Sequence, residues 1–133
     1  MALTRITEAQ HQKHLMQWWA VAHNHFGLPE LALSHVPNGE YRTLITGAKL
    51  KSMGMRKGFP DLQLLTPAPP PSTYGMLFVE LKSEYGKVSQ EQTEFLAYLR
   101  SRGYAACLCY GWDAARRCIE NYLAGQEIPD KLA

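Results

Sequence analysis

The chain has 133 residues, of which 46% are hydrophobic and 20% charged, and its formal net charge is +2. These values are typical of a soluble globular protein and predict a single domain, residues 1–133, with a core large enough to fold alone. No apolar run reaches the roughly 18–20 residues of a membrane span, and the N-terminus does not resemble a signal peptide, so no membrane association is expected. The net charge is too small to establish a nucleic-acid partner, so the distribution of charge must decide.

The three cysteines form neither a disulfide framework nor a zinc-binding pattern. Cys107 and Cys109 are expected to face opposite sides of a strand. An odd number of unpaired thiols suits a reducing compartment, so the expected location is the cytoplasm.

The first predicted element is a helix over about residues 8–26, because Thr7 followed by Gln10 resembles a capping box. Its apolar stripe is formed by Leu15, Trp19, Ala22 and Phe26. Toward the N-terminus the same stripe reaches Glu8, which either favours the positive end of the helix dipole or overhangs a metal site. Because no pattern such as HExxH is present, we expect surface positions for His11, His14, His23 and His25.

Residues 31–36 are expected to form a strand that ends at the turn signal Pro37-Asn38-Gly39. His35 at its exit is interpreted either as a packed, hydrogen-bonded histidine or as a contact to DNA or to the reacting groups. The next segment, with a short helix over residues 48–53, has several basic residues and no acidic one: Arg42, Lys49, Lys51, Arg56 and Lys57. Such a charge run is usually a solvated face, but here it leads into an acidic motif, which favours contact with a phosphate backbone.

Residues 58–65 and 76–82 are two apolar runs joined by a loop rich in proline, and they predict a pair of strands. A simple hairpin with Leu65 opposite Met76 places Asp61 opposite Glu80. Directly opposed residues on one sheet face lie about 4.5–5.5 Å apart at Cβ, where two carboxylates repel each other. A divalent cation between them removes that repulsion, so we predict a metal site here.

Strand alternation adds a third group, because Glu80 and Lys82 share one sheet face while Leu77, Val79 and Leu81 face the core. Hard carboxylate ligands suit Mg²⁺ or Mn²⁺, and Lys82 could orient a water or stabilise charge on a phosphate. The alternative is that the aspartate is a turn residue and that the Glu-x-Lys pattern is a surface salt bridge.

The rest of the chain predicts a stiff loop at residues 67–72, although a Pro-rich ligand segment is also possible, then a helix capped by Ser89 and running to about Arg102. Gln92 lies three residues after Ser89, so a capping box explains it from the sequence alone. A buried strand over residues 104–110 and a helix over residues 112–123 follow, and the last residues are expected to be frayed.

This order of elements looks like the PD-(D/E)xK nuclease core, and within that superfamily the chain resembles the VRR-NUC (virus-type replication-repair nuclease) family. The resemblance spans nearly the whole chain and is carried by Glu8, Pro37-Asn38-Gly39, Gly58-Phe59-Pro60-Asp61, Glu80-Leu81-Lys82, Ser89-Gln90-Glu91-Gln92 and Gly103-Tyr104. It implies an α/β fold with a restriction-endonuclease-like core, a central mixed β-sheet flanked by helices.

The resemblance also implies a catalytic site in which Asp61, Glu80 and the backbone carbonyl of Leu81 hold a divalent metal. It implies that Lys82 positions the attacking water and that Glu8 and Gln92 complete the site. Stand-alone members of phage or bacterial type resemble Holliday-junction resolvases, which implies a homodimer that cuts two symmetric strands.

We therefore expect a Mg²⁺- or Mn²⁺-dependent, structure-specific DNA endonuclease that resembles Holliday-junction resolvases. The alternatives are a nuclease acting on flaps, nicks or other nucleic acid, or a non-catalytic module that binds branched DNA. The residues expected to contact DNA are Asn38, His35, Arg42, Lys49, Lys51, Arg56 and Lys57.

Overall fold

The computed structural model describes residues 5–37 and 44–133. Its helical elements are α1 (Glu8–Ala22), η1 (His23–Phe26), η2 (Glu30–Ala32), α2 (Leu44–Ser52), α3 (Gln90–Ser101) and α4 (Trp112–Leu123). Its strands are β1 (Leu33–His35), β2 (Leu62–Leu64), β3 (Leu77–Lys82), β4 (Ala105–Tyr110) and β5 (Lys131–Leu132). Within the described ranges, no helix is both long and apolar enough to cross a membrane.

The five strands form one mixed sheet in the order β1-β2-β3-β4-β5. Strands β1, β2 and β3 pair antiparallel, whereas β3, β4 and β5 pair parallel. The parallel step from β3 to β4 needs a crossover, which α3 supplies. The expected α/β fold with a central mixed sheet and flanking helices is therefore confirmed.

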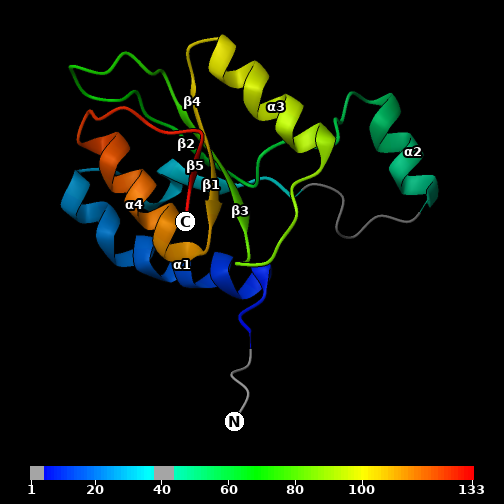
Figure 1. Ribbon diagram of the computed structural model, residues 1–133, viewed down its shortest axis with the longest axis horizontal. Helices are drawn as coiled ribbons and strands as arrows, with labels where there is room; N and C mark the ends of the chain where they lie inside the picture. Colours follow the sequence, from blue (N-terminus) through cyan, green and yellow to red (C-terminus); the bar gives the residue numbers. More distant parts are fainter. Residues whose placement is uncertain (1–4, 38–43) are drawn as a thin grey trace.

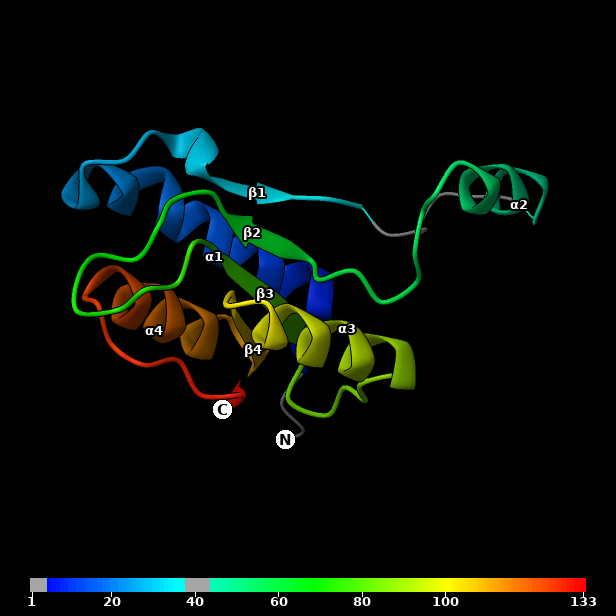
Figure 2. The same cartoon turned by 90° about the horizontal axis from the view of Figure 1, so that it is seen from above.

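Helices cover both faces of the sheet, as Figures 1 and 2 show. Helices α1 and α4 lie side by side on one face, and α3 lies on the other. Helix α2 stands apart from the sheet, beyond β1 and the start of α3, and carries part of the basic segment. The sheet end at which α1 begins and β3 finishes is where the acidic residues of the sequence motifs gather.

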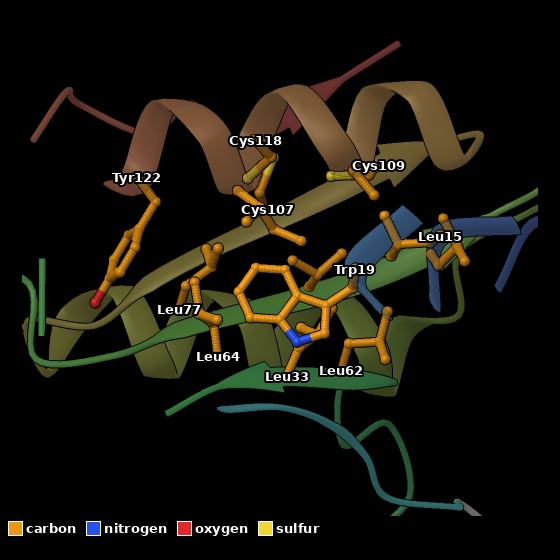
Figure 3. Packing of buried hydrophobic residues seen from close by; sticks show 14 of the residues in the cluster. Leu15, Trp19, Leu33, Leu62, Leu64, Leu77, Cys107, Cys109, Cys118 and Tyr122 are labelled. Carbon is orange, nitrogen blue, oxygen red and sulfur yellow. The ribbon is translucent and has the colours of Figure 1, made fainter. Parts of the chain in front are cut away.

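Strand alternation in β3 divides the core into two clusters, and Leu77, Val79 and Leu81 face the core as the sequence predicted. Leu77, Val79 and Leu81 belong to the larger cluster under α1 and α4, while Phe78 belongs to the smaller cluster under α3. Figure 3 shows Trp19 of α1 within the larger cluster. The indole N–H of Trp19 donates to the Glu30 carbonyl at 2.7 Å. Glu80 and Lys82 share the face of Phe78 and lie farther along β3, toward its end.

The hairpin register is the predicted one. Leu64 pairs with Leu77 and Leu62 pairs with Val79, which is the alignment that sets Asp61 opposite Glu80. The connection between β2 and β3 is a docked loop, since the Ser72 hydroxyl donates to the Gly125 carbonyl at 2.7 Å and the Tyr74 hydroxyl donates to Glu127 Oε2 at 2.9 Å.

Several local predictions need correction. The strand expected over residues 31–36 is only Leu33–His35, because Glu30–Ala32 form a 3-10 turn after Pro29. The C-terminal residues expected to be frayed instead form β5, which pairs with β4, and Leu132 packs on the core. Backbone hydrogen bonds and one apolar side chain thus fix the C-terminus, which the sequence alone predicts to be frayed.

The expected surface position is wrong for His11, which is buried. The Trp112 N–H at the start of α4 donates to His11 Nδ1 at 3.1 Å, so that nitrogen must be unprotonated. Burial lowers the pKa of His11, while Glu84 raises it to a smaller extent, and the net direction fits this acceptor role. His11 therefore joins α1 to α4.

Candidate metal centre

Asp61 immediately precedes β2 and is fixed by both its side chain and its backbone. The Leu81 N–H donates to Asp61 Oδ2 at 2.9 Å, which ties the carboxylate to β3. The Asp61 carbonyl accepts the Val36 N–H at 3.2 Å and lies 2.8 Å from His35 Nδ1. His35 thus has the hydrogen-bonded position that was one of its two interpretations, and it lies directly behind the aspartate.

The turn before Asp61 depends on Gly58. Its φ is +86°, a conformation that side chains rarely adopt, and a Cβ there would lie 2.5 Å from the Glu91 carbonyl carbon and 2.7 Å from the Gln92 nitrogen. The ring of Phe59 packs edge-on against those of Phe78 and Phe95, with centroids 6.0 and 5.4 Å away. The turn is therefore pressed against the first turn of α3 and anchored in the smaller core cluster.

Glu80 is the most buried acidic residue of the described chain, with an exposed fraction of 1%. Its Oε1 accepts a hydrogen bond from Gln92 Nε2 at 2.7 Å and lies 3.7 Å from Lys82 Nζ. While both carboxyls are ionised, no group among the described residues donates a hydrogen bond to its buried Oε2. A buried carboxylate oxygen without a partner is costly, so this atom points to a cation.

Gln92 caps α3 and also contacts Glu80. Its Oε1 accepts the Ser89 N–H at 2.9 Å, and the Ser89 hydroxyl accepts the Gln92 N–H at 3.1 Å, which completes the capping box. Its Nε2 at the same time donates to Glu80. The start of α3 therefore holds one oxygen of Glu80 in place.

Glu8 begins α1 and also lies near Lys82. It is the first residue of α1, which is capped by Thr7 and Gln10, and its Oε2 lies 4.0 Å from Lys82 Nζ. Ligand oxygens of Glu8, Asp61 and Glu80 all lie within 4.8 Å of one another. The structure thus brings together the three acids and Lys82, whose exposed fraction is only 8%.

Burial and mutual repulsion disturb the protonation of the paired carboxylates. Burial raises the pKa of Asp61, although the hydrogen bond from Leu81 partly offsets this. Burial first, and then the negative charge of Asp61, raise the pKa of Glu80 from 4.5 to about 8, against the opposing effect of Lys82. Without a cation one carboxyl holds a proton; with one, both can be ionised. Three hard oxygen donors and an unpartnered buried oxygen fit a divalent cation.

The basic residues lie beside this centre rather than in it. Lys49 and Lys51 occupy the last turn of α2, and exposed Arg56 and Lys57 follow on the path into Gly58. Figure 1 shows this segment projecting from the side of the molecule. Asn38 and Arg42 lie outside the described residues, so the structure places only part of the predicted DNA-binding set.

Sequence reasoning missed two exposed residues next to the acids. The Arg5 guanidinium carbon lies 3.8 Å from the centroid of the Tyr85 ring, in a hollow that residues 5–8 and 83–85 line. Their closeness in the sequence to the motif residues could have indicated them, because Arg5 lies three residues before Glu8 and Tyr85 lies three residues after Lys82.

The thiols of Cys107, Cys109 and Cys118 also gather, with their sulfur atoms within 4.8 Å of one another. Cys107 and Cys109 share the face of β4 that lies under α4, so the expectation that they face opposite sides is wrong: residues two apart on a strand point the same way. All three are fully buried in the apolar cluster seen in Figure 3, where cysteine packs as a small hydrophobic residue.

Comparison with known proteins agrees with this geometry. Residues 2–113 match the VRR-NUC domain family. A solved structure described as a VRR_NUC domain protein is similar, with a TM-score of 0.78 and 25% sequence identity over 96% of this chain and 97% of the other. No curated protein matches the chain. Because the match covers most of its length, this chain belongs to the VRR-NUC domain family, a family of PD-(D/E)xK-type nucleases.

Proposed function

We propose that this protein is a divalent-metal-dependent DNA endonuclease that acts on branched DNA and resembles Holliday-junction resolvases. The observation that carries the proposal is the unpartnered, buried Oε2 of Glu80, which lies within a cluster of three acids. A purely structural salt bridge would satisfy that oxygen. In a site that binds a cation, by contrast, this oxygen is free of protein donors because the cation is its ligand partner.

Asp61, Glu80 and the backbone carbonyl of Leu81 would hold Mg²⁺ or Mn²⁺. When bound, such a cation acts as a Lewis acid that polarises the phosphate and supports the leaving oxygen. The Leu81 N–H and Gln92 side chain hold the two carboxylates from the protein side. Gln92 is therefore a positioning residue that acts through Glu80.

Lys82 supplies the positive charge of the protein at the reaction centre. Its Nζ lies 3.7 Å from Glu80 and 4.0 Å from Glu8, so the two acids define where the ammonium group is held. From there it would orient the attacking water and stabilise negative charge that develops on the phosphate. Glu8 would act through Lys82, as a second positioning residue.

The basic segment supports a polyanionic substrate. Lys49, Lys51, Arg56 and Lys57 are exposed and lead into the turn that carries Asp61. Contacts from such residues fix the position of a nucleic-acid backbone and carry little information about its sequence. We extend this set to Asn38, Arg42 and His35, and propose a homodimer because a four-way junction is resolved by two symmetric cuts.

The function is tested by incubating purified protein with a mobile four-way junction in Mg²⁺, Mn²⁺ or EDTA, alongside matched flap, nicked and linear duplex substrates. We expect paired symmetric nicks in the junction that require the metal. Equal rates on the junction and on linear duplex would remove the branched-DNA part of the proposal. Binding without cutting, unchanged in EDTA, would replace it with a non-catalytic binding module.

The mechanism is tested with Asp61→Asn, Glu80→Gln and Lys82→Ala, each expected to abolish detectable cleavage while the circular dichroism spectrum keeps its native form. Lys131→Ala is the matched control, because Lys131 is exposed on β5. It should cut at the wild-type rate. Robust cleavage by Lys82→Ala would refute the role assigned to that lysine.

A further inference from the structure

A hollow adjoins the metal centre where the residues before α1 face the turn after β3. Residues 5–8 line one side of it and residues 83–85 the other. Glu8 lines this hollow and also belongs to the acidic cluster, so the hollow opens directly beside the reacting groups. The function proposed above leaves it unused.

The prominent feature of this hollow is the stacked pair of Arg5 and Tyr85. The guanidinium carbon lies 3.8 Å from the ring centroid, and Tyr85 has an exposed fraction of 64%. Exposed cation–π pairs contribute only about 0.5–1 kcal/mol, so the stabilisation gained by joining the two loops is a weak reason for an arginine and a tyrosine at this exposed position. A guanidinium and an aromatic ring together are, however, the groups on which nucleobases stack.

The turn that carries Tyr85 is fixed to the reaction centre. The Gly86 N–H donates to the Ser83 carbonyl at 3.0 Å, which closes the turn. A Cβ on Gly86 would lie 3.2 Å from Lys82 Cβ and 3.3 Å from Lys82 Cδ, so the turn rests on the stem of the lysine. Tyr85 therefore stands at a set position relative to Lys82.

A second hollow lies on the other side of Glu8, where α1 faces the end of β1, and Lys13 and His35 line it. Because Glu8 lines both hollows, the acidic cluster stands between them. A nucleic-acid strand with one phosphate at the cluster would place its neighbouring nucleotides on either side. One of those nucleotides then meets Arg5 and Tyr85.

Charge decides which part of that nucleotide is bound. The hollow contains one cation, Arg5, together with two acids, Glu8 and Glu84. This balance disfavours a phosphate and leaves the flat, uncharged base as the better ligand. In an intact duplex both faces of a base are covered by its neighbours, so the ligand must be unpaired or splayed out.

We propose that Arg5 and Tyr85 form a stacking subsite for the unpaired base of the nucleotide that adjoins the scissile phosphate. This inference rests on the nuclease function proposed above and gives a reason for a preference for branched DNA, where such bases occur. It assigns substrate selection to a hollow that the basic segment does not line. The basic segment would hold the backbone, and the subsite would detect the unpaired base.

The test is a binding cycle with a fluorescent branched oligonucleotide in the Asp61→Asn background, where Asn Oδ1 can still accept the Leu81 N–H. The nucleotide on each side of the mapped cut is made abasic in turn. On one side this should weaken binding about tenfold. Tyr85→Leu should weaken binding of the intact strand by a similar factor and remove the abasic penalty, whereas Tyr85→Phe, which keeps the ring, should retain it.

Tyr98→Leu is the matched control, because Tyr98 is exposed to 61% on α3 and lies away from the hollow. It should keep both the affinity and the abasic penalty. An abasic penalty that persists in full in Tyr85→Leu would overturn the subsite and leave the pair as a structural tie. Failure of the background protein to bind any oligonucleotide would instead overturn the proposed function itself.

Discussion

Two groups of three potential metal ligands are present in the described chain, and their ligand atoms are equally close together. Glu8, Asp61 and Glu80 form one, and the thiols of Cys107, Cys109 and Cys118 form the other; in each, the ligand atoms lie within 4.8 Å of one another. Distance alone therefore does not separate a metal centre from a packed core. The surroundings of the two groups do.

The thiols lie between β4 and α4, fully buried among apolar side chains. The acids lie at the end of the sheet, where Glu8 and Asp61 are partly exposed, Lys82 supplies a counter-charge and two hollows give access. The acidic group also contains a buried oxygen without a donor among the described residues. Access, charge and an unmet ligand atom are the grounds on which we assign the proposed metal site to the acidic group.

The largest expected effect separates the two groups by activity. Glu80→Gln should reduce metal-dependent cleavage by at least about 100-fold, because it removes a charged ligand while Gln92 can still donate to the remaining carbonyl oxygen. Cys118→Ala should leave the rate at saturating metal and substrate unchanged. Single-turnover rates on one substrate measure both, and a rate loss in Cys118→Ala as large as that in Glu80→Gln would contradict the distinction.

The next effect concerns the turn that brings the acidic group together. Gly58→Ala should destabilise the protein by about 2–4 kcal/mol and impair cleavage, since the new Cβ would lie 2.5 Å from the backbone of Glu91 and φ is positive. The collision would push the turn away from α3 and separate Asp61 from Glu80. Urea unfolding and cleavage assays measure the two effects.

Gly54→Ala is the control, because φ there is also positive but nothing lies within 4 Å of the added Cβ. It should cost about 1 kcal/mol for the strained backbone and leave cleavage intact. If the two variants behaved alike, the close approach of Gly58 to α3 would not matter for the site.

Sequence reasoning located the acidic group because the information was local and periodic. One hairpin register was enough to oppose Asp61 and Glu80, and strand alternation placed Lys82 on the same face. Each of these steps needs only the period of an element and the length of a loop. The apolar stripe of α1 left Glu8 with two interpretations, and the family resemblance implied its place in the site.

The features that sequence reasoning missed depend on contacts between distant segments. His11 is buried because α4 packs against α1, which joins residues about 100 positions apart. The Arg5–Tyr85 pair requires the start of the chain to meet the turn after β3. The contact of Gln92 with Glu80 could not be inferred from the local pattern, because the capping box already explained that residue, and only the family resemblance implied it. The periodicity of a single element carries no information about contacts between distant segments.

A smaller effect links the acidic group to pH. Because the pKa of Glu80 is raised from 4.5 to about 8 in the fold, the native state holds a proton that the unfolded chain has lost between those values. The free energy of unfolding of the metal-free protein should therefore fall as pH rises from about 5 to 8, by at most about 1.4 kcal/mol per pH unit from this group. Glu80→Gln should flatten that slope, because the variant has no carboxyl at this position and groups distant from Glu80 cancel in the comparison.

The same protonation equilibrium predicts the response to metal. Cations bind the ionised carboxylates and displace the proton, so Mg²⁺ or Mn²⁺ should raise the melting temperature more at pH 8 than at pH 6. Differential scanning fluorimetry in EDTA and in excess metal measures this. An equal shift at both pH values, or an undiminished shift in Glu80→Gln, would place the cation elsewhere.

The smallest effect belongs to the thiol group and completes the contrast. If the three cysteines are packing residues, Cys118→Ala should cost only about 1–2 kcal/mol of stability, whereas Cys118→Ser should cost more because a buried hydroxyl without a partner adds a desolvation penalty. A metal-binding trio would behave differently: both variants would lose the same metal-dependent stabilisation, and Zn²⁺ or Cd²⁺ would raise the melting temperature of the wild-type protein alone. We expect no such rise attributable to the thiols, because full burial between β4 and α4 leaves a cation no path to the sulfur atoms.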